Sequence, residues 1–251
     1  MIQKVILGDC LEKLNEVPDK SVDMVCVDLP YQITKNKWDS LIDLDKLWTH
    51  YLRIGKDNTP FIFTASQPFT TILINSNFNL FRYCLVWDKK GTTGFQNAKK
   101  MPLKRHEDIV VFYRNLPTYN PQKEIRGKPR KKGGSRIDNG CYGELRSSES
   151  FNNEYYPTSI IEISNAVKIG LVHPTQKPVP LMEYLIKTYS NEGDLVLDNC
   201  AGSFTTAVAC DNLNRNWICI EKELKYCEIG LERINKNREI SKKEKILSII
   251  R

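Results

Sequence analysis

The sequence predicts an α/β protein with a mostly parallel β-sheet and helices on both faces. Short apolar runs of strand length alternate with longer amphipathic segments, which is typical of successive βα units. The chain has 251 residues, 41% of them hydrophobic, which is enough for one compact domain with a full core. Between residues 89 and 170 the alternation gives way to Gly, Lys, Arg, Asn and Pro, which predicts an insertion.

The elements follow one another in a regular order outside this insertion. Apolar runs predict strands over residues 4–10, 21–28, 60–66, 81–87, 194–200 and 217–223, with one more inside the insertion at 106–115. Amphipathic segments predict helices over residues 11–17, 44–56, 67–76, 177–190, 203–213 and 225–239, the last extended by 240–251. We therefore expect one discontinuous domain, residues 1–88 and 171–251, that contains the insertion 89–170.

Composition narrows the class of protein. Lys and Arg outnumber Asp and Glu by 37 to 30, and the resulting net charge of +7 suits a polyanionic partner without requiring one. Eight cysteines are scattered without a CxxC pair, which indicates reduced thiols and no metal site. No apolar run is long enough for a signal peptide or a membrane span, so we expect a cytoplasmic protein that binds no membrane.

Residues 193–223, GDLVLDNCAGSFTTAVACDNLNRNWICIEKE, have the spacing of a nucleoside-binding βαβ unit. A strand ends at Asp198, a turn of small residues and a helix follow, and a second strand ends at Glu221. Ala201 and Gly202 allow the backbone to approach a ligand closely, and an acid about 20 residues further on can bind ribose hydroxyls. Taken alone, the pattern also fits an ordinary turn in any α/β protein.

A second candidate site follows the strand over residues 21–28, where Asp28, Leu29, Pro30 and Tyr31 form the sequence DLPY. An exocyclic amine on a nucleobase is a poor nucleophile because its lone pair is delocalised into the ring. The Asp28 carboxylate and the Leu29 carbonyl can accept its hydrogens and draw the nitrogen toward tetrahedral geometry. Pro30 would stiffen the loop, and Tyr31 offers a face for an extruded base. In isolation, DLPY also fits a simple Asp-x-Pro turn.

Together, DLPY and DNCAGSFTT resemble the catalytic and cofactor motifs of the amino-methylating DNA methyltransferases. ILGDC is similar to the family's acid-bearing loop, and HPTQKPVPLMEYLI is similar to its lead-in to the cofactor site. WDKKGTTGFQNAKKMPLKRHEDIVVFY is also similar to family members. The catalytic motif comes first, a basic region next and the cofactor motif last, which is the order of the permuted β group. The resemblance implies a Rossmann-like methyltransferase sheet, with residues 89–170 as a target-recognition insertion.

The resemblance implies S-adenosyl-L-methionine as the cofactor and assigns residues to it. The cofactor residues that it implies are Asp9 near the adenine, Glu221 on the ribose, Thr175, Gln176 and Lys177 at the methionine end, and Asp198, Ala201, Gly202 and Ser203 along the turn. Two residues depart from the family pattern. Leu29 replaces a proline, which is harmless if only its carbonyl is used. Phe204 replaces a glycine, so we expect either backbone strain or a ring that enters a pocket lined by small residues.

Double-stranded DNA is the implied partner, and the β group also suggests a homodimer. The run NPQKEIRGKPRKKGGSR is rich in cations suited to phosphate contact, although a charge run can also be a solvated face. The predicted DNA-binding residues are Lys89, Lys99, Lys100, Lys104, Arg105, Lys128, Arg130, Lys131 and Lys132. Tyr155 and Tyr156 could stack on a base or belong to the core of the insertion.

The resulting hypothesis is a sequence-specific methyltransferase that acts on the N6 amine of a flipped-out adenine in a bacterial or phage-infected cell. Asp at the first position of DLPY favours adenine in this family. N4 methylation of cytosine remains open because it needs the same acceptors. A DNA-binding protein that has lost turnover also remains open because of Phe204, whereas the basic insertion disfavours RNA or protein-glutamine methylation.

Overall fold

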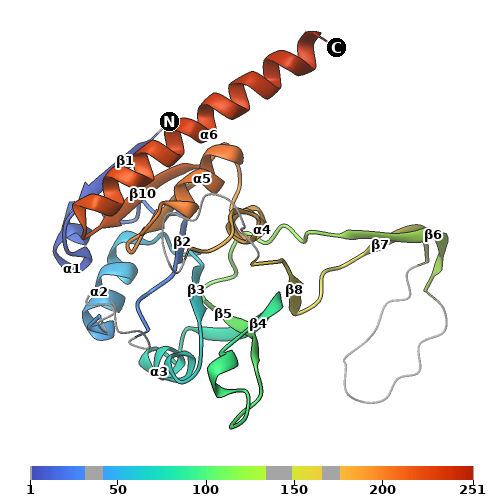
Figure 1. Ribbon diagram of the computed structural model, residues 1–251, viewed down its shortest axis with the longest axis horizontal. Coiled ribbons are helices and arrows are strands. Elements are labelled where there is room, and N and C mark those ends of the chain that lie inside the picture. The colour runs from blue at the N-terminus through green and yellow to red at the C-terminus, as the bar shows by residue number, and fades with distance from the viewer. Residues whose placement is uncertain (1, 32–41, 134–148, 166–175, 251) are drawn as a thin grey trace. The chain divides into compact units, whose positions relative to one another are not determined.

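The computed structural model describes residues 2–31, 42–133, 149–165 and 176–250, with side chains up to residue 243 (Figure 1). The chain divides into two compact units. The larger unit comprises Met1–Asn120 and Ser159–Arg251, and the smaller comprises Pro121–Thr158. The smaller unit is shorter than the insertion 89–170 that the sequence predicts, because two strands inside that range and the end of a third belong to the sheet of the larger unit.

The larger unit contains an eight-stranded sheet in the order β1-β10-β9-β2-β3-β5-β4-β8. Its strands are β1 (Gln3–Leu7), β2 (Met24–Val27), β3 (Phe61–Ala65), β4 (Phe81–Thr93), β5 (Lys104–Phe112), β8 (Ile160–Glu162), β9 (Leu195–Asp198) and β10 (Asn216–Glu221). The first five strands in spatial order are parallel to one another. Among the described strands of this sheet, only β5 is antiparallel to both of its neighbours, β3 and β4. The predicted mostly parallel sheet is therefore confirmed.

Helices cover both faces of this sheet, as Figure 1 shows. They are α1 (Cys10–Lys13), α2 (Leu44–Ile54), α3 (Phe69–Ser76), α4 (Val179–Tyr189), α5 (Thr205–Asn212) and α6 (Leu224–Ile250), with short 3-10 turns η1 (Leu14–Glu16) and η2 (Phe95–Asn97). Because side chains alternate along a strand, Val25 and Val27 of β2 pack with α1, α2 and α3, whereas Met24 and Cys26 pack with α4, α5 and α6. None of the described helices is long and apolar enough to cross a membrane.

Phe204 precedes α5 and meets both expectations raised by its departure from the family pattern. Its backbone is left-handed, with φ at 59°, which is strained for a residue with a side chain. Its ring is fully buried and lies against Gly230 of α6. A Cβ atom built on Gly230 would lie 2.0 Å from the Phe204 ring, so the glycine makes room for the phenylalanine.

We predict that Gly230→Ala destabilises the protein by about 1–3 kcal/mol through overpacking against Phe204. The sign is informative, since the same substitution in an unconstrained helix interior stabilises by roughly 0.5–1 kcal/mol. Urea unfolding at fixed pH measures the effect. In a Phe204→Gly background the ring is gone, and Gly230→Ala should then be tolerated. A loss of the same size in both backgrounds would show that the Phe204 ring does not exclude a side chain at residue 230.

The smaller unit contains a two-stranded antiparallel hairpin of β6 (Glu124–Lys132) and β7 (Ser150–Tyr155). The Tyr155 ring lies beside three cations, with the Arg126 and Arg130 guanidinium carbons at 5.4 and 5.6 Å and the Lys132 ammonium at 3.7 Å from its centroid. Cation–π attraction of this kind contributes about 0.5–1 kcal/mol at exposed sites. The Tyr155 ring therefore stabilises a cluster of three β6 cations within the smaller unit.

Candidate functional site

Four acidic residues follow the carboxyl ends of four neighbouring parallel strands. Asp9 comes two residues after β1, Glu221 and Asp198 end β10 and β9, and Asp28 comes directly after β2. The sheet order β1-β10-β9-β2 sets these strands side by side. At about 4.8 Å per strand, the row from β1 to β2 extends over roughly 14 Å. Ligands of open α/β sheets bind at this edge, so the two motifs predicted from sequence form one candidate site.

Asp28 is held by donors from three parts of the chain. The Tyr31 hydroxyl donates to its Oδ1 at 2.6 Å, and the Thr64 hydroxyl of β3 donates to the same oxygen. The Lys177 ammonium, close before α4, donates to its Oδ2 at 2.6 Å. These contacts fix the orientation of the carboxylate. A carboxylate has about four acceptor positions, so one on Oδ2 remains for a further donor.

Lys177 connects Asp28 to a second, buried pair of charges. Its ammonium lies 3.5 Å from Oε2 of Glu107 on β5, and Oε1 of Glu107 accepts from the Lys89 ammonium of β4 at 3.2 Å. Although burial opposes its charge, the carboxylates of Asp28 and Glu107 raise the pKa of Lys177. Lys177 is therefore a cation at neutral pH, and the four groups together carry no net charge.

Tyr31 is a hydrogen-bond donor in this site. Burial, together with the carboxylates of Asp28 and Glu107, raises its pKa well above the usual value, so the hydroxyl keeps its proton. The ring stacks on Phe69 of α3, with centroids 5.1 Å apart and an interplanar angle of 22°. The Lys177 ammonium lies 5.5 Å from the Tyr31 centroid. The sequence suggested that the Tyr31 ring could stack on an extruded base. In the structure this ring already packs against Phe69.

Asp198 is buried at the end of β9, only 3% exposed, and its carboxyl group orders the turn that follows. Oδ1 accepts from the backbone N–H of Cys200 at 3.1 Å, and Oδ2 accepts from the Thr206 hydroxyl at 2.5 Å. Burial raises its pKa to about 7. Asp198 therefore connects the strand to the first turn of α5.

We predict that Asp198 makes the protein less stable as the pH rises toward neutrality. Its pKa moves from 3.8 to about 7 on folding, so between these values the unfolded chain loses the proton and the folded chain retains it. The unfolding free energy falls across this window and levels off above it. At about 1.4 kcal/mol per pKa unit, the fall is on the order of 4 kcal/mol.

Comparison with Asp198→Asn isolates this contribution. Urea unfolding at about pH 4.5 and about pH 7.5 should show the asparagine variant gaining stability relative to wild type at the higher pH. Exposed Asp45→Asn is the matched control and should parallel wild type at both values. Parallel behaviour of Asp198→Asn as well would show that the Asp198 carboxyl is not protonated in the folded protein.

The turn after β9 lies against the end of β10. Glu221 accepts from the backbone N–H of Gly202 at 2.7 Å and from that of Glu223 at 2.9 Å, while Ala201 donates its N–H to the Ile220 carbonyl. Gly202 has a φ of 51°, a conformation that suits glycine. The small residues at 201 and 202 therefore permit close packing of two strand ends, and Glu221 keeps acceptor positions for another ligand.

The remaining cofactor residues predicted from sequence differ in their contacts, and one of them lies outside the described residues. Asp9 uses Oδ1 to cap α1, accepting from the Leu11 N–H at 3.0 Å, and its Oδ2 lies 3.4 Å from the Lys222 ammonium. Ser203 is buried and accepts from Arg233 of α6 at 3.1 Å. Thr175 lies outside the described residues, and Gln176 immediately follows that gap.

Sequence reasoning missed Thr64 and Glu107 and assigned Lys177 only to the cofactor. Thr64 is a polar residue in the otherwise apolar run FIFTA of β3, which was a usable signal. Glu107 occurs in β5, a strand whose last four residues are buried. A charged residue in such a strand indicates a partner, but only the folded structure identifies its partners as Lys177 and Lys89.

The predicted DNA-binding residues are divided between the two units and differ in exposure. Lys89 is only 5% exposed and pairs with Glu107, so it is not an exposed cation. Lys99 and Lys100 are exposed after η2. Arg105 forms a bidentate pair with Asp88, with both N–O distances 2.7 Å. Lys104 is half-buried, and four more cations lie along β6: Lys128, Arg130, Lys131 and Lys132.

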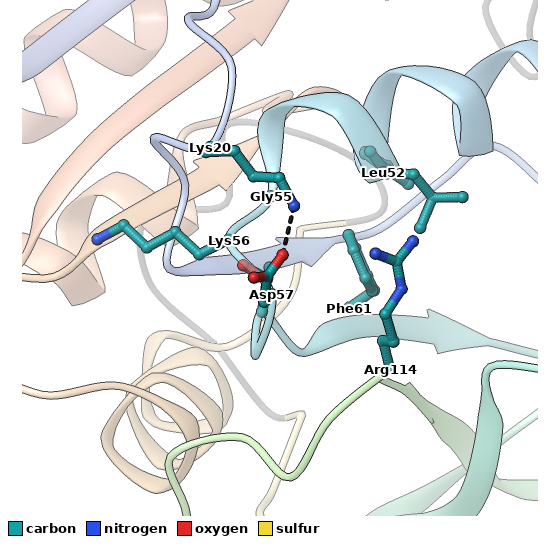
Figure 2. A pocket seen from close by; sticks show the side chains of 9 residues that line it. Lys20, Leu52, Gly55, Lys56, Asp57, Phe61 and Arg114 are labelled. Atoms are coloured by element: carbon teal, nitrogen blue, oxygen red, sulfur yellow. Dashed lines mark hydrogen bonds and ion pairs between the residues drawn. The ribbon is translucent and has the colours of Figure 1, made fainter.

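A small hollow elsewhere on the larger unit is separate from this site (Figure 2). Its lining includes Gly55 just after α2, Phe61 at the start of β3 and Arg114 after β5. These positions lie at the amino ends of the parallel strands, opposite the edge that carries Asp28. Within the described ranges, no three His, Cys, Asp or Glu residues are grouped so that they could hold a metal ion.

Known proteins provide an independent comparison. DNA adenine methyltransferase YhdJ of Escherichia coli (strain K12) is 29% identical over 256 residues, covering 92% of this chain and 82% of the relative. Type II methyltransferase M1.MboII of Moraxella bovis is 28% identical over 252 residues, covering 90% of this chain and 94% of the relative. The similarity to each therefore extends over most of both proteins.

Solved structures show the same fold. The M1.HpyAVI–SAM complex superposes with a TM-score of 0.65 at 24% identity, covering 94% of this chain and all of that one. PvuII DNA methyltransferase, described as cytosine-N4-specific, superposes with a TM-score of 0.67 at 16% identity, covering 93% and 90%. A family model described as DNA methylase matches residues 22–232, which include Asp28, Asp198 and Glu221. This chain belongs to the DNA methylase family.

Proposed function

We propose that the protein transfers a methyl group from S-adenosyl-L-methionine to the N6 amine of adenine in double-stranded DNA. The observation that carries the proposal is the oriented carboxylate of Asp28 at the same sheet edge as Asp198 and Glu221. Membership of the DNA methylase family supports the reaction type. The order of motifs along the chain favours the permuted β group.

The chain's own groups can activate the target amine. The free acceptor position on Asp28 Oδ2 takes one hydrogen of the amine, and the Leu29 carbonyl takes the other. These contacts favour tetrahedral nitrogen, whose lone pair is then available for attack on a methyl group. Tyr31 and Thr64 contribute by holding Oδ1, so the carboxylate does not rotate away. The base must leave the duplex to reach this edge, as in other enzymes that modify bases.

The residues at the neighbouring strand ends fit a nucleoside-containing cofactor. Two acceptor positions of the Glu221 carboxylate bind backbone N–H groups, and the others are available for ribose hydroxyls. Gly202 and Ala201 permit close approach of the backbone. We assign Asp9, Gln176 and Ser203 to the same ligand, together with Thr175, while Lys177 serves Asp28. When bound, the cofactor supplies an electrophilic methyl group.

DNA contact is proposed for the β6 cations and the loop after η2. Lys128, Arg130, Lys131 and Lys132 lie on exposed β6, and a two-stranded ribbon can enter the major groove. Lys99 and Lys100 add exposed charge on the larger unit. Such cations bind phosphates without reading sequence.

One experiment tests the reaction and the base. Purified protein is incubated with labelled S-adenosyl-L-methionine and unmodified genomic DNA, and the DNA is digested to nucleosides and sequenced with modification detection. N6-methyladenine at one recurring motif is the expected product. N4-methylcytosine as the product would retain the mechanism and overturn the choice of base. This outcome is tested because one protein with the same fold is described as cytosine-N4-specific. DNA binding without transfer would indicate an inactive binding module.

A further inference from the structure

A chain of four alternating charges extends from the proposed catalytic carboxylate into the sheet. Asp28, Lys177, Glu107 and Lys89 follow one another, with separations of 2.6, 3.5 and 3.2 Å between successive charged groups. Their side chains are 24%, 11%, 16% and 5% exposed, so Asp28 is the least buried of the four and Lys89 the most buried. The far pair, Glu107 and Lys89, has no place in the mechanism described above.

This far pair is not needed to neutralise the site. Asp28 and Lys177 already form a neutral pair at 2.6 Å. Burying two further charges costs several kcal/mol per ion, and apolar residues of similar volume often serve stability as well or better. Asp108, the next residue of β5, accepts from Thr70 of α3 at 2.6 Å, so it does not join these charges. Stability therefore does not explain why Glu107 occupies this position.

The geometry around Glu107 supplies an explanation. Its Oε2 atom is buried and has no hydrogen-bond partner among the described residues, yet it lies 3.5 Å from the Lys177 ammonium. The same ammonium donates to Asp28 Oδ2, the oxygen that must also accept the target amine. An ammonium bound by Asp28 alone would compete with the amine and weaken the carboxylate as an acceptor. The Glu107 carboxylate also attracts the Lys177 ammonium, and this attraction weakens the interaction between Lys177 and Asp28.

We propose that Glu107 is a positioning residue for methyl transfer: it shares the Lys177 ammonium with Asp28 and so keeps one acceptor position of Asp28 Oδ2 available to the amine. Lys89 holds Glu107 through its other oxygen. This inference rests on the proposed function, because it assigns a role in the same reaction.

Glu107→Gln tests the proposal by removing the charge and keeping the shape. The single-turnover rate of methyl transfer is expected to fall about tenfold, within the range of coupling energies for contacting groups. The dissociation constants for S-adenosyl-L-methionine and DNA should stay unchanged, since Glu107 acts through Lys177 on the reacting amine. Glu162→Gln is the matched control, because Glu162 pairs with Lys90 at 2.9 Å between β8 and β4 in an exposed position. Its rate should equal that of wild type.

Two further variants separate positioning from folding. Glu107→Gln leaves buried Lys89 unpaired, so Glu107→Gln/Lys89→Met removes both far charges together. It should fold and show the same loss of rate, whereas recovery of the wild-type rate would overturn the proposal. In a Lys177→Met background, Glu107→Gln should cause no further loss, and an equal loss there would also overturn it. Absence of transfer by wild type would overturn the proposed function itself, and the role of Glu107 with it.

Discussion

Asp28→Ala is expected to abolish methyl transfer while cofactor and DNA binding stay largely intact. The carboxylate accepts a hydrogen of the target amine mainly as the nitrogen becomes tetrahedral, so its loss raises the barrier more than it weakens binding. A positioned acid–base group contributes about 10²–10⁴-fold, which sets the expected fall in the single-turnover rate. Labelled-methyl transfer measures the rate, and titration with each ligand measures binding.

Two variants make the Asp28 result interpretable. Asp28→Asn retains the volume and one acceptor oxygen, but its amide donates toward Lys177 and removes the charge, so we expect it to be inactive as well. Asp19→Ala removes an exposed carboxylate, 69% exposed, and should leave the rate unchanged. If Asp28→Ala lost DNA binding as severely as methyl transfer, Asp28 would be a DNA-binding residue and not the acceptor of the amine.

Neutralising the β6 cations is expected to have the second large effect, on DNA affinity and its salt dependence. The variant replaces Lys128, Arg130, Lys131 and Lys132 with glutamine. Each cation that contacts a phosphate contributes about 0.9 to the slope of log K against log salt concentration. Loss of all four contacts would therefore flatten the slope by up to roughly 3.6. Fluorescence anisotropy of a labelled duplex over a salt series measures it.

A matched variant controls for the loss of net charge. Lys46, Lys236, Lys242 and Lys243 are exposed lysines on α2 and α6, and their replacement by glutamine removes the same charge from the whole protein. Its slope should stay near that of wild type. A slope that is equal in both variants would show that β6 makes no phosphate contacts. Far-ultraviolet circular dichroism establishes that the hairpin substitutions leave the larger unit folded.

Local sequence determined the elements and the ends of strands. Apolar runs located β2, β3, β9 and β10, because a strand buried on both faces is apolar at nearly every position. Asp28 and Asp198 could be recognised as strand ends because each is an acid that directly follows an apolar run. The pattern failed for β8, which is three residues long, and for β6, whose residues are almost all exposed. Neither strand has the burial that periodicity detects.

Tertiary structure alone decided how these residues meet. Lys177 and Asp28 are 149 residues apart, and Glu107 reaches Lys177 only because β5 enters the sheet antiparallel beside β3. The ring of Phe204 fits because Gly230 of α6 packs against it, a relation with no local signature. A sequence pattern reports the burial of each residue along its own element. Sheet order and register set which buried charges become neighbours, so the environment of Asp28 could be described only from the folded chain.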